Sequence, residues 1–174
     1  VAGAKKVLEK AKKEQKELTE KKKKFFDKET LTNPYSDTRI MFGNPSKDIK
    51  RVMAGIDASA AEILIADRLT EKAHSAGSGK GIDMVISHHP TGHALASLDE
   101  VMDVQVDMYA QAGVPENIAH ALFEERKSHV RRGIGPLNHA QAVDAARLLD
   151  VPLMAIHTVW DNLGNDFMNK NIEN

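Results

Sequence analysis

The stretch RVMAGIDASAAEILIADRLTEKAHSAGSGKGIDMVIS, residues 51–87, decides the fold class of this 174-residue chain. Apolar residues predict a strand over 50–58 and a second strand over 82–87. Between them, Ser59 can cap a helix, and Glu62 three residues later completes a capping box. Because a strand, a helix and a strand follow each other in this order, we expect a βαβ unit with two parallel strands.

The remaining predicted elements extend this unit into a larger sheet. A short strand precedes it at 39–43, and a further strand of the parallel type lies at 151–157. The run 82–87 is apolar enough to be buried on both faces. Three helices between these strands and one closing helix are expected at 98–112, 115–132, 138–150 and 158–169. The fold class is therefore α/β, with a mostly parallel or mixed sheet flanked by helices and a helical insertion.

A lysine-rich arm precedes this domain. Residues 1–28 hold eleven lysines against five acidic side chains, and the remainder of the chain is net acidic. Apolar residues near a 3.5-residue spacing over 2–27 predict one long helix that lies across its own domain. We therefore divide the chain into an N-terminal charged helix, 1–28, and an α/β domain, 29–174. Nucleic-acid binding through the arm is an unfavoured alternative, because Glu and Gln alternate with the lysines and no aromatic residues are interleaved.

Composition excludes several classes of protein. With 41% hydrophobic and 28% charged residues, a packed core is expected rather than disorder. No apolar run approaches 18 residues, so we expect no membrane span. The chain has no cysteine, so any metal ion must be held by His, Asp and Glu. The cytoplasm is the expected compartment.

Histidines occur where two of the predicted strands end. His88 and His89 directly follow one strand, His157 ends another, and Asp161 comes four residues later. In open α/β sheets, binding sites form beyond the carboxyl ends of parallel strands. We therefore expect these side chains to meet at one edge of the sheet.

The paired histidines raise a question of direction. Neighbouring side chains of a regular strand point to opposite faces. Since Pro90 stops the ladder, both imidazoles can splay outward at the strand end. Each could then reach one of two metal ions about 3.5–4 Å apart, with a carboxylate between them. Imidazole and carboxylate ligands suit Zn, Fe, Mn, Co or Ni.

Each of these residues also has a purely structural interpretation. Paired histidines are often exposed side chains without a ligand, and His157 could simply form a hydrogen bond at the strand end. Thr158 as N-cap with Asp161 at the third helical position would be an ordinary helix start. GSGKG, 77–81, runs from helix into strand, the reverse of a phosphate loop, so phosphate binding is not expected. The other histidines are expected in a loop or on helices, at His74, His93, His120, His129 and His139.

The ordered pair of motifs resembles the Ngg-interacting-factor-three-like family, also described as GTP cyclohydrolase type two-like dinuclear metal-binding proteins. An HHP motif on a strand end is followed there by a His-Thr-x-x-Asp segment that runs into a Gly-Asn-Asp stretch. The resemblance covers roughly residues 50–174. The matching residues are His88, His89, Pro90, His157, Thr158, Asp161, Gly164, Asn165 and Asp166.

The resemblance implies a ligand set of His88, His89 and Asp161 for two divalent metal ions. It implies that His157 and Asp57, at the end of an earlier strand, shape the site. It also implies a homo-oligomer, commonly a hexamer. Because the family completes its site with a His and a Glu in a second half, we expect a C-terminal part beyond this sequence.

By analogy with the family, we expect a dinuclear metal-dependent hydrolase acting on a nucleotide-like or other polar small molecule. The alternative is a non-catalytic metal-binding or regulatory protein. Bound metal without turnover would distinguish the second function from the first.

Overall fold

A four-stranded mixed sheet forms the centre of the molecule. The computed structural model describes residues 2–96 and 98–172. The strands lie in the order β1-β4-β3-β2, with β4 parallel to β3, β3 parallel to β2, and β1 antiparallel to β4. The α/β class and the parallel pairing within the βαβ unit are confirmed. The strands are β1 (Arg39–Phe42), β2 (Val52–Gly55), β3 (Met84–Ser87) and β4 (Leu153–Ala155).

Helix α3 (Ala60–Ser75) connects β2 to β3, as the sequence predicts. The Ser59 hydroxyl accepts a hydrogen bond from the Ala61 amide at 3.1 Å. The Glu62 carboxylate accepts one from the Ser59 amide at 2.7 Å, so the predicted capping box is confirmed. These bonds satisfy amides that the first helical turn leaves without partners, which defines where α3 begins.

The core lies on one face of the sheet. Helices α3 and α8 (Gln141–Leu149) pack together over it, and Ile63 of α3 and Leu153 of β4 are both fully buried. Met84 and Ile86 alternate with buried residues of β3 and stay only half-buried. The expectation that β3 is buried on both faces is therefore wrong, because the core helices cover only the face that its alternate residues share.

The segment between the two motif-bearing strands is helical, as expected. The predicted helix 98–112 is interrupted at Met102, so α5 and α6 are separate. Helices α6 and α7 form a hairpin, and Lys127 donates to Asp103 across it at 2.7 Å. The insertion comprises α4 (Gly92–Ala96), α5 (Leu98–Val101), α6 (Asp103–Gln111) and α7 (Glu116–Ile134), and then α8.

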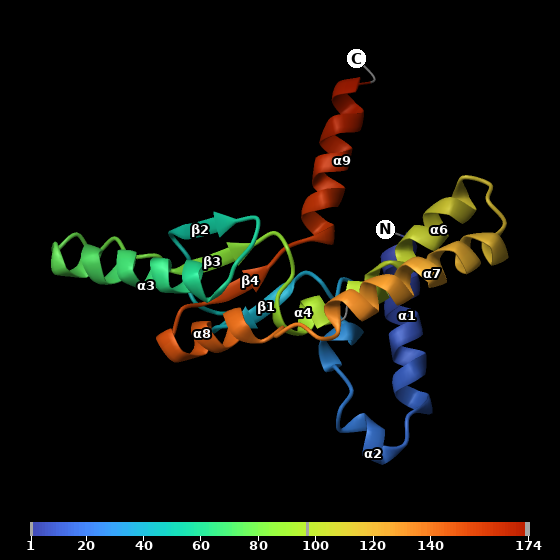
Figure 1. Ribbon diagram of the computed structural model, residues 1–174, viewed down its shortest axis with the longest axis horizontal. Helices are drawn as coiled ribbons and strands as arrows, with labels where there is room; N and C mark the ends of the chain where they lie inside the picture. The colour runs from blue at the N-terminus through green and yellow to red at the C-terminus, as the bar shows by residue number, and fades with distance from the viewer. Residues whose placement is uncertain (1, 97, 173–174) are drawn as a thin grey trace.

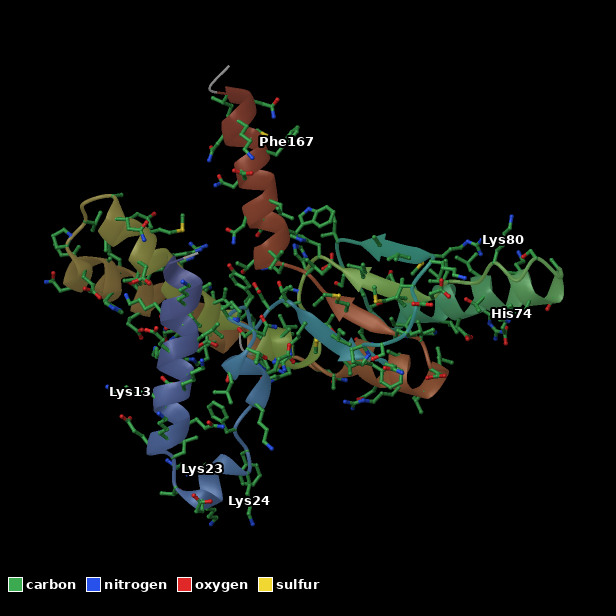
Figure 2. The ribbon with its side chains drawn as sticks, turned by 180° about the vertical axis from the view of Figure 1, so that it is seen from behind. Lys13, Lys23, Lys24, His74, Lys80 and Phe167 are labelled. Atoms are coloured by element: carbon green, nitrogen blue, oxygen red, sulfur yellow. The ribbon has the colours of Figure 1, made fainter. Side chains whose placement is uncertain are left out.

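The N-terminal arm is two helices rather than one. Helix α1 (Ala2–Glu17) ends before Thr19, and α2 (Glu20–Lys23) begins after it. Thr19 has an extended conformation, with ψ 154°, and its carbonyl accepts from two amides of the following turn, which restarts the helix. Figure 1 shows α1 beside the α6–α7 hairpin, away from the sheet. Figure 2 shows Lys13, Lys23 and Lys24 along this arm. The proposed division at residue 28 stays a prediction.

Helix α9 (Thr158–Ile172) follows β4 and projects from the rest of the molecule (Figure 1). None of its described residues is buried, and Trp160, Leu163 and Phe167 are all more than 60% exposed. Figure 2 shows Phe167 near the far end of this helix. Among the described residues, no helix has the length and apolar character needed to cross a membrane.

Candidate metal centre

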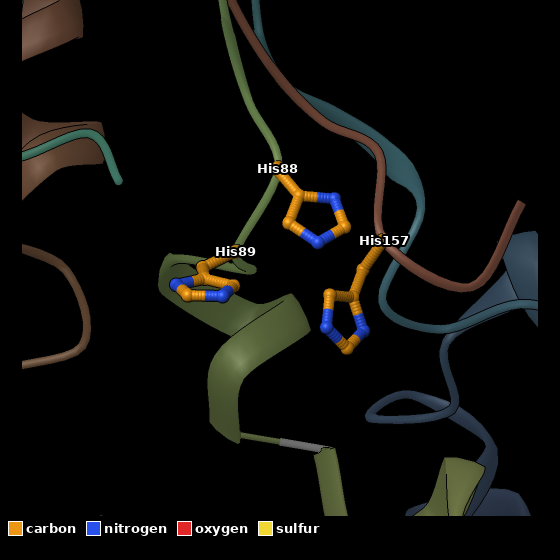
Figure 3. A group of neighbouring side chains, drawn as sticks. All are labelled: His88, His89 and His157. Carbon is orange, nitrogen blue, oxygen red and sulfur yellow. The ribbon is translucent and has the colours of Figure 1, made fainter. Parts of the chain in front are cut away.

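Three histidines converge at the carboxyl ends of β3 and β4. His88 and His89 follow β3, and His157 follows β4, its parallel neighbour in the sheet. One ring nitrogen from each of the three lies within 4.8 Å of the other two. Figure 3 shows the three rings around a common space. The strand-end reasoning correctly brought together two segments that lie almost 70 residues apart in the chain.

The two adjacent imidazoles splay to the same side, as predicted for a strand end. Their ring centroids lie 5.2 Å apart. Strand β3 ends at Ser87, whose buried hydroxyl donates to the His89 carbonyl at 2.5 Å. This bond turns the backbone immediately after the strand, so His88 and His89 no longer alternate across the sheet.

The Nδ1 atom of every one of these rings already has an oxygen partner. A backbone carbonyl and two carboxylates fill this role. Because carbonyl and carboxylate oxygens only accept hydrogen bonds, each Nδ1 is assigned a proton, and in the neutral ring each Nε2 then keeps a free lone pair. The pairs are His88 with the Ile156 carbonyl at 3.2 Å, His89 with Asp57 at 2.8 Å and His157 with Asp37 at 3.0 Å.

A carboxylate lies beside two of the free nitrogens. Oδ1 of Asp161 is 3.5 Å from Nε2 of His88, and Oδ2 is 3.9 Å from Nε2 of His157. Asp161 is in the first turn of α9, which directs its side chain back toward the strand ends. The alternative interpretation of Thr158 as an N-cap does not hold, because Thr158 is the first residue of α9 and its hydroxyl donates to Asp37.

The chemistry of this donor set fits a divalent metal ion. Zn and neighbouring transition metals bind imidazole rings and carboxylates. In such sites the second nitrogen of the imidazole ring is hydrogen-bonded to an oxygen, as it is here. The side chains of His89 and Asp161 are about half exposed, at 50% and 56%, so small solutes can reach them. The arrangement therefore combines a suitable ligand set with access from solvent. Whether His88, His89 and Asp161 bind a metal stays a prediction.

Asp57 and Asp37 each bond one ring of the cluster, but they differ in burial. Asp57 follows β2 and is largely exposed. Asp37 precedes β1, is fully buried, and was not singled out from the sequence. In the sequence, Asp37 is recognisable only as an acidic residue just before a predicted strand. Its position becomes informative once β1 is known to pair with β4.

The other described histidines lie outside the cluster, as expected. His93 is in the short helix α4 rather than in a loop, and its ring bonds Asp27 at 3.1 Å. Hydrogen bonds from the Arg39 guanidinium lower the pKa of the Asp27 carboxyl. His139 was expected on a helix but lies in the turn before α8, and its ring bonds the Ile134 carbonyl at 2.8 Å. GSGKG is an exposed loop between α3 and β3, and nothing in its position favours phosphate binding.

A separate hollow of about 740 Å³ lies between α1 and the α6–α7 hairpin. Lys6 and Lys10 of α1 and Asp103 of α6 are among the side chains that line it, and the three clustered histidines are not. Its size comes from the way the charged arm rests on the helical insertion. The hollow and the histidine cluster are therefore separate features of the molecule.

Fold and site together define an α/β protein with a histidine-rich candidate metal centre at the carboxyl edge of its sheet. No protein-family profile and no curated protein sequence matches the chain. Among solved structures, the crystal structure of a NIF3 superfamily protein from Sphaerobacter thermophilus is similar to it, with 32% sequence identity and a TM-score of 0.57. The match covers 70% of this chain and 40% of that protein.

This similarity agrees with the two ordered histidine motifs, and the chain belongs to the NIF3 superfamily, the Ngg-interacting-factor-three-like family named above. The chain spans 40% of the length of that relative. The activity, substrate and partners of this chain are therefore proposals.

Proposed function

We propose that this chain binds divalent metal through His88, His89 and Asp161, and that it is a metal-dependent hydrolase for a nucleotide-like or other polar small molecule. The observation that supports this most is the convergence of three imidazoles, each with its Nδ1 already bonded to oxygen. We include His157 among the ligands, because its Nε2 faces the same Asp161 carboxylate as that of His88.

A bound divalent cation supplies Lewis acidity, which lowers the pKa of a water ligand toward neutrality and polarises a substrate oxygen. The residues of this chain would hold and orient the reacting groups. Nε2 of His88 and Nε2 of His157 both face the Asp161 carboxylate, so these three side chains would hold a cation between them. Asp57 holds the half-exposed ring of His89, and its own exposure leaves it able to orient a polar group of the substrate.

We propose two ions, which Zn, Fe, Mn, Co or Ni could supply. Four protein ligands shared between two ions leave coordination positions for water and substrate, as catalytic sites require. The partial exposure of His89 and Asp161 supports access to such positions.

The first test is metal content by plasma mass spectrometry. We expect stoichiometric metal in the purified chain and its loss in His88→Ala and Asp161→Ala, with folding preserved by circular dichroism. His74→Ala is the matched control, since His74 is exposed in the last turn of α3 (Figure 2) and is not one of the clustered histidines. Unchanged metal content in both site variants would refute the ligand assignment.

The second test is turnover. A panel of nucleotides, phosphate esters and carboxylic esters is assayed before and after chelation by EDTA, and again after each candidate metal is restored. We expect hydrolysis that disappears with chelation and with His88→Ala, and that returns with metal only in the unchanged chain. Metal-independent hydrolysis would contradict the mechanism.

A non-catalytic binding or regulatory role is the second candidate. The exposed apolar side chains of α9, among them Trp160, Leu163 and Phe167, favour it, because such a surface suits contact with other proteins. Stoichiometric metal without turnover of any compound in the panel would support this role.

The family resemblance favours a homo-oligomer, commonly a hexamer, as the state of assembly, and sedimentation velocity would measure it. We also propose the cytoplasm as compartment, because the chain has no cysteine.

A further inference from the structure

We infer that Asp37 is a positioning residue of the metal centre: it holds the His157 ring with Nε2 directed at the site and anchors the helix that carries Asp161. This inference rests on the proposed metal binding. It concerns a residue that neither the motifs nor the family resemblance singles out.

Asp37 is a carboxylate in an unusual place. It is fully buried, just before β1, and none of its neighbours in the loop shares this burial. A buried carboxylate is costly unless hydrogen bonds replace its hydration. Here Oδ2 accepts from Nδ1 of His157 at 3.0 Å, from the Thr158 hydroxyl at 2.6 Å and from the Thr158 amide at 3.3 Å. Thr38 supplies a further hydroxyl, which donates to Oδ1 at 3.3 Å.

These bonds fix His157 in two respects. An ionised carboxylate accepts hydrogen bonds and cannot donate them, so it selects the form of the ring with the proton on Nδ1 and the lone pair on Nε2. The bond also sets the ring direction. The backbone amide of His157 donates to the Thr38 hydroxyl at 3.1 Å, so the main chain is held by the same segment. Nε2 is left facing Asp161 at 3.9 Å.

The same carboxylate anchors α9. Because the Thr158 amide is the first of the helix and has no acceptor within it, a carboxylate at this end is favourable for both the amide and the helix dipole. Asp161 lies three residues further on, within that first turn. One buried side chain thus positions two of the groups proposed to bind metal.

Asp57 also bonds a histidine of the cluster and can be compared with Asp37. Asp57 bonds the Nδ1 of His89 at 2.8 Å, but its side chain is 79% exposed and forms no other hydrogen bond to the described residues. Water can replace an exposed partner, whereas nothing can replace a fully buried one. Loss of Asp37 should therefore affect the centre more than loss of Asp57.

The test uses Co²⁺ as the probe, titrated into the full chain and followed by its visible absorption. Carboxylates behind metal-binding histidines typically contribute about 10–100-fold to metal affinity. We expect Asp37→Asn to weaken Co²⁺ binding by this factor and Asp57→Asn by less. We expect Asp37→Asn to have a smaller further effect in a His157→Ala background, because His157, one of the two groups that Asp37 positions, is already lost.

Two controls separate positioning from general stability. Thr158→Val removes one hydroxyl bond to Asp37 and leaves the His157 contact, so it should lower the free energy of unfolding without a comparable loss of Co²⁺ affinity. Asp27→Asn removes a carboxylate that also bonds a histidine ring, that of His93, outside the cluster, and should leave Co²⁺ affinity unchanged.

A measurement on the metal-free, unchanged chain needs no variant to fold. Long-range proton–nitrogen NMR correlations report which nitrogen of His157 is protonated. We expect Nδ1 to carry a proton; a ring whose only proton is on Nε2 would overturn the inference. Unchanged Co²⁺ affinity in Asp37→Asn would also overturn it. Unchanged Co²⁺ affinity in His157→Ala would overturn it as well, but would leave His88, His89 and Asp161 as the proposed ligands. Absence of Co²⁺ binding by the unchanged chain would refute the proposed function itself, and the inference with it.

Discussion

Gly92 offers a quantitative test of how the HHP segment is packed. It follows the motif by two residues, is buried, and has a left-handed backbone, with φ +57°. A Cβ atom at this position would lie 2.6 Å from Cγ2 of Val143 in the core and 2.8 Å from Cε of Met41. Gly92→Ala must therefore pay for both its backbone conformation and a steric overlap.

The magnitude follows from these two contributions. A left-handed conformation costs a non-glycine residue roughly 1–2 kcal/mol. Overpacking of a core costs roughly 1–3 kcal/mol. Gly77 has φ +64° and nothing within 4 Å of an added Cβ, so Gly77→Ala carries only the backbone cost. We expect a loss of about 2–5 kcal/mol for Gly92→Ala and about 1–2 kcal/mol for Gly77→Ala.

The assay is urea unfolding at equilibrium, with the midpoint and slope fitted for each variant. Val143→Ala removes the methyl group that the new Cβ would meet. In that background the cost of Gly92→Ala should fall toward that of Gly77→Ala, since only the flexible end of Met41 still lies close to the new Cβ, and the coupling energy should be roughly 1–3 kcal/mol. Strictly additive losses, or equal losses at the two glycines, would refute the argument that α8 packs too closely on Gly92 for a side chain.

Two further predictions concern a charge and the core. Hydrogen bonds from Arg39 are the main reason why the pKa of Asp27 lies below its ordinary 3.8. The stability that this carboxylate contributes is therefore present above pH 3.8 and is lost as the pH falls through the pKa of the folded state. The difference in urea midpoint between Asp27→Asn and the unchanged chain should thus be largest near neutrality and vanish in acid; a difference independent of pH would contradict this. Leu153→Ala, at a fully buried position of the interior strand β4, should lower the free energy of unfolding by about 2–5 kcal/mol. The matched change Leu148→Ala, at an 86% exposed position, should stay within about 0.5 kcal/mol, and similar losses at both would show that the core is elsewhere.

Local patterns were sufficient for the βαβ unit. Ser59 and Glu62 lie three residues apart and satisfy each other's backbone amides, so their capping box needed no tertiary information. The long arm was predicted less well. The apolar spacing extends over 2–27 with interruptions at Gln15 and Lys22, but the helix breaks at Thr19, whose extended backbone a hydrophobic pattern does not reveal.

The sequence reached part of the candidate site because strand ends are local features. His88, His89 and His157 each directly follow an apolar run, and parallel strands bring their carboxyl ends to one edge. Asp37 could not be found in this way. It lies 120 residues from His157, and its role depends on the antiparallel pairing of β1 with β4.

The sequence by itself thus determined the α/β class, the parallel pairing within the βαβ unit, and the two segments that supply imidazoles, because each depends on periodicity or capping within a short stretch. Only the tertiary structure decided which face of the sheet is covered, where Asp161 lies relative to the rings, and which buried carboxylate holds His157. These features depend on contacts between residues distant in the chain. Such contacts form only when burial of apolar surface brings the elements together, and no local pattern records their partners.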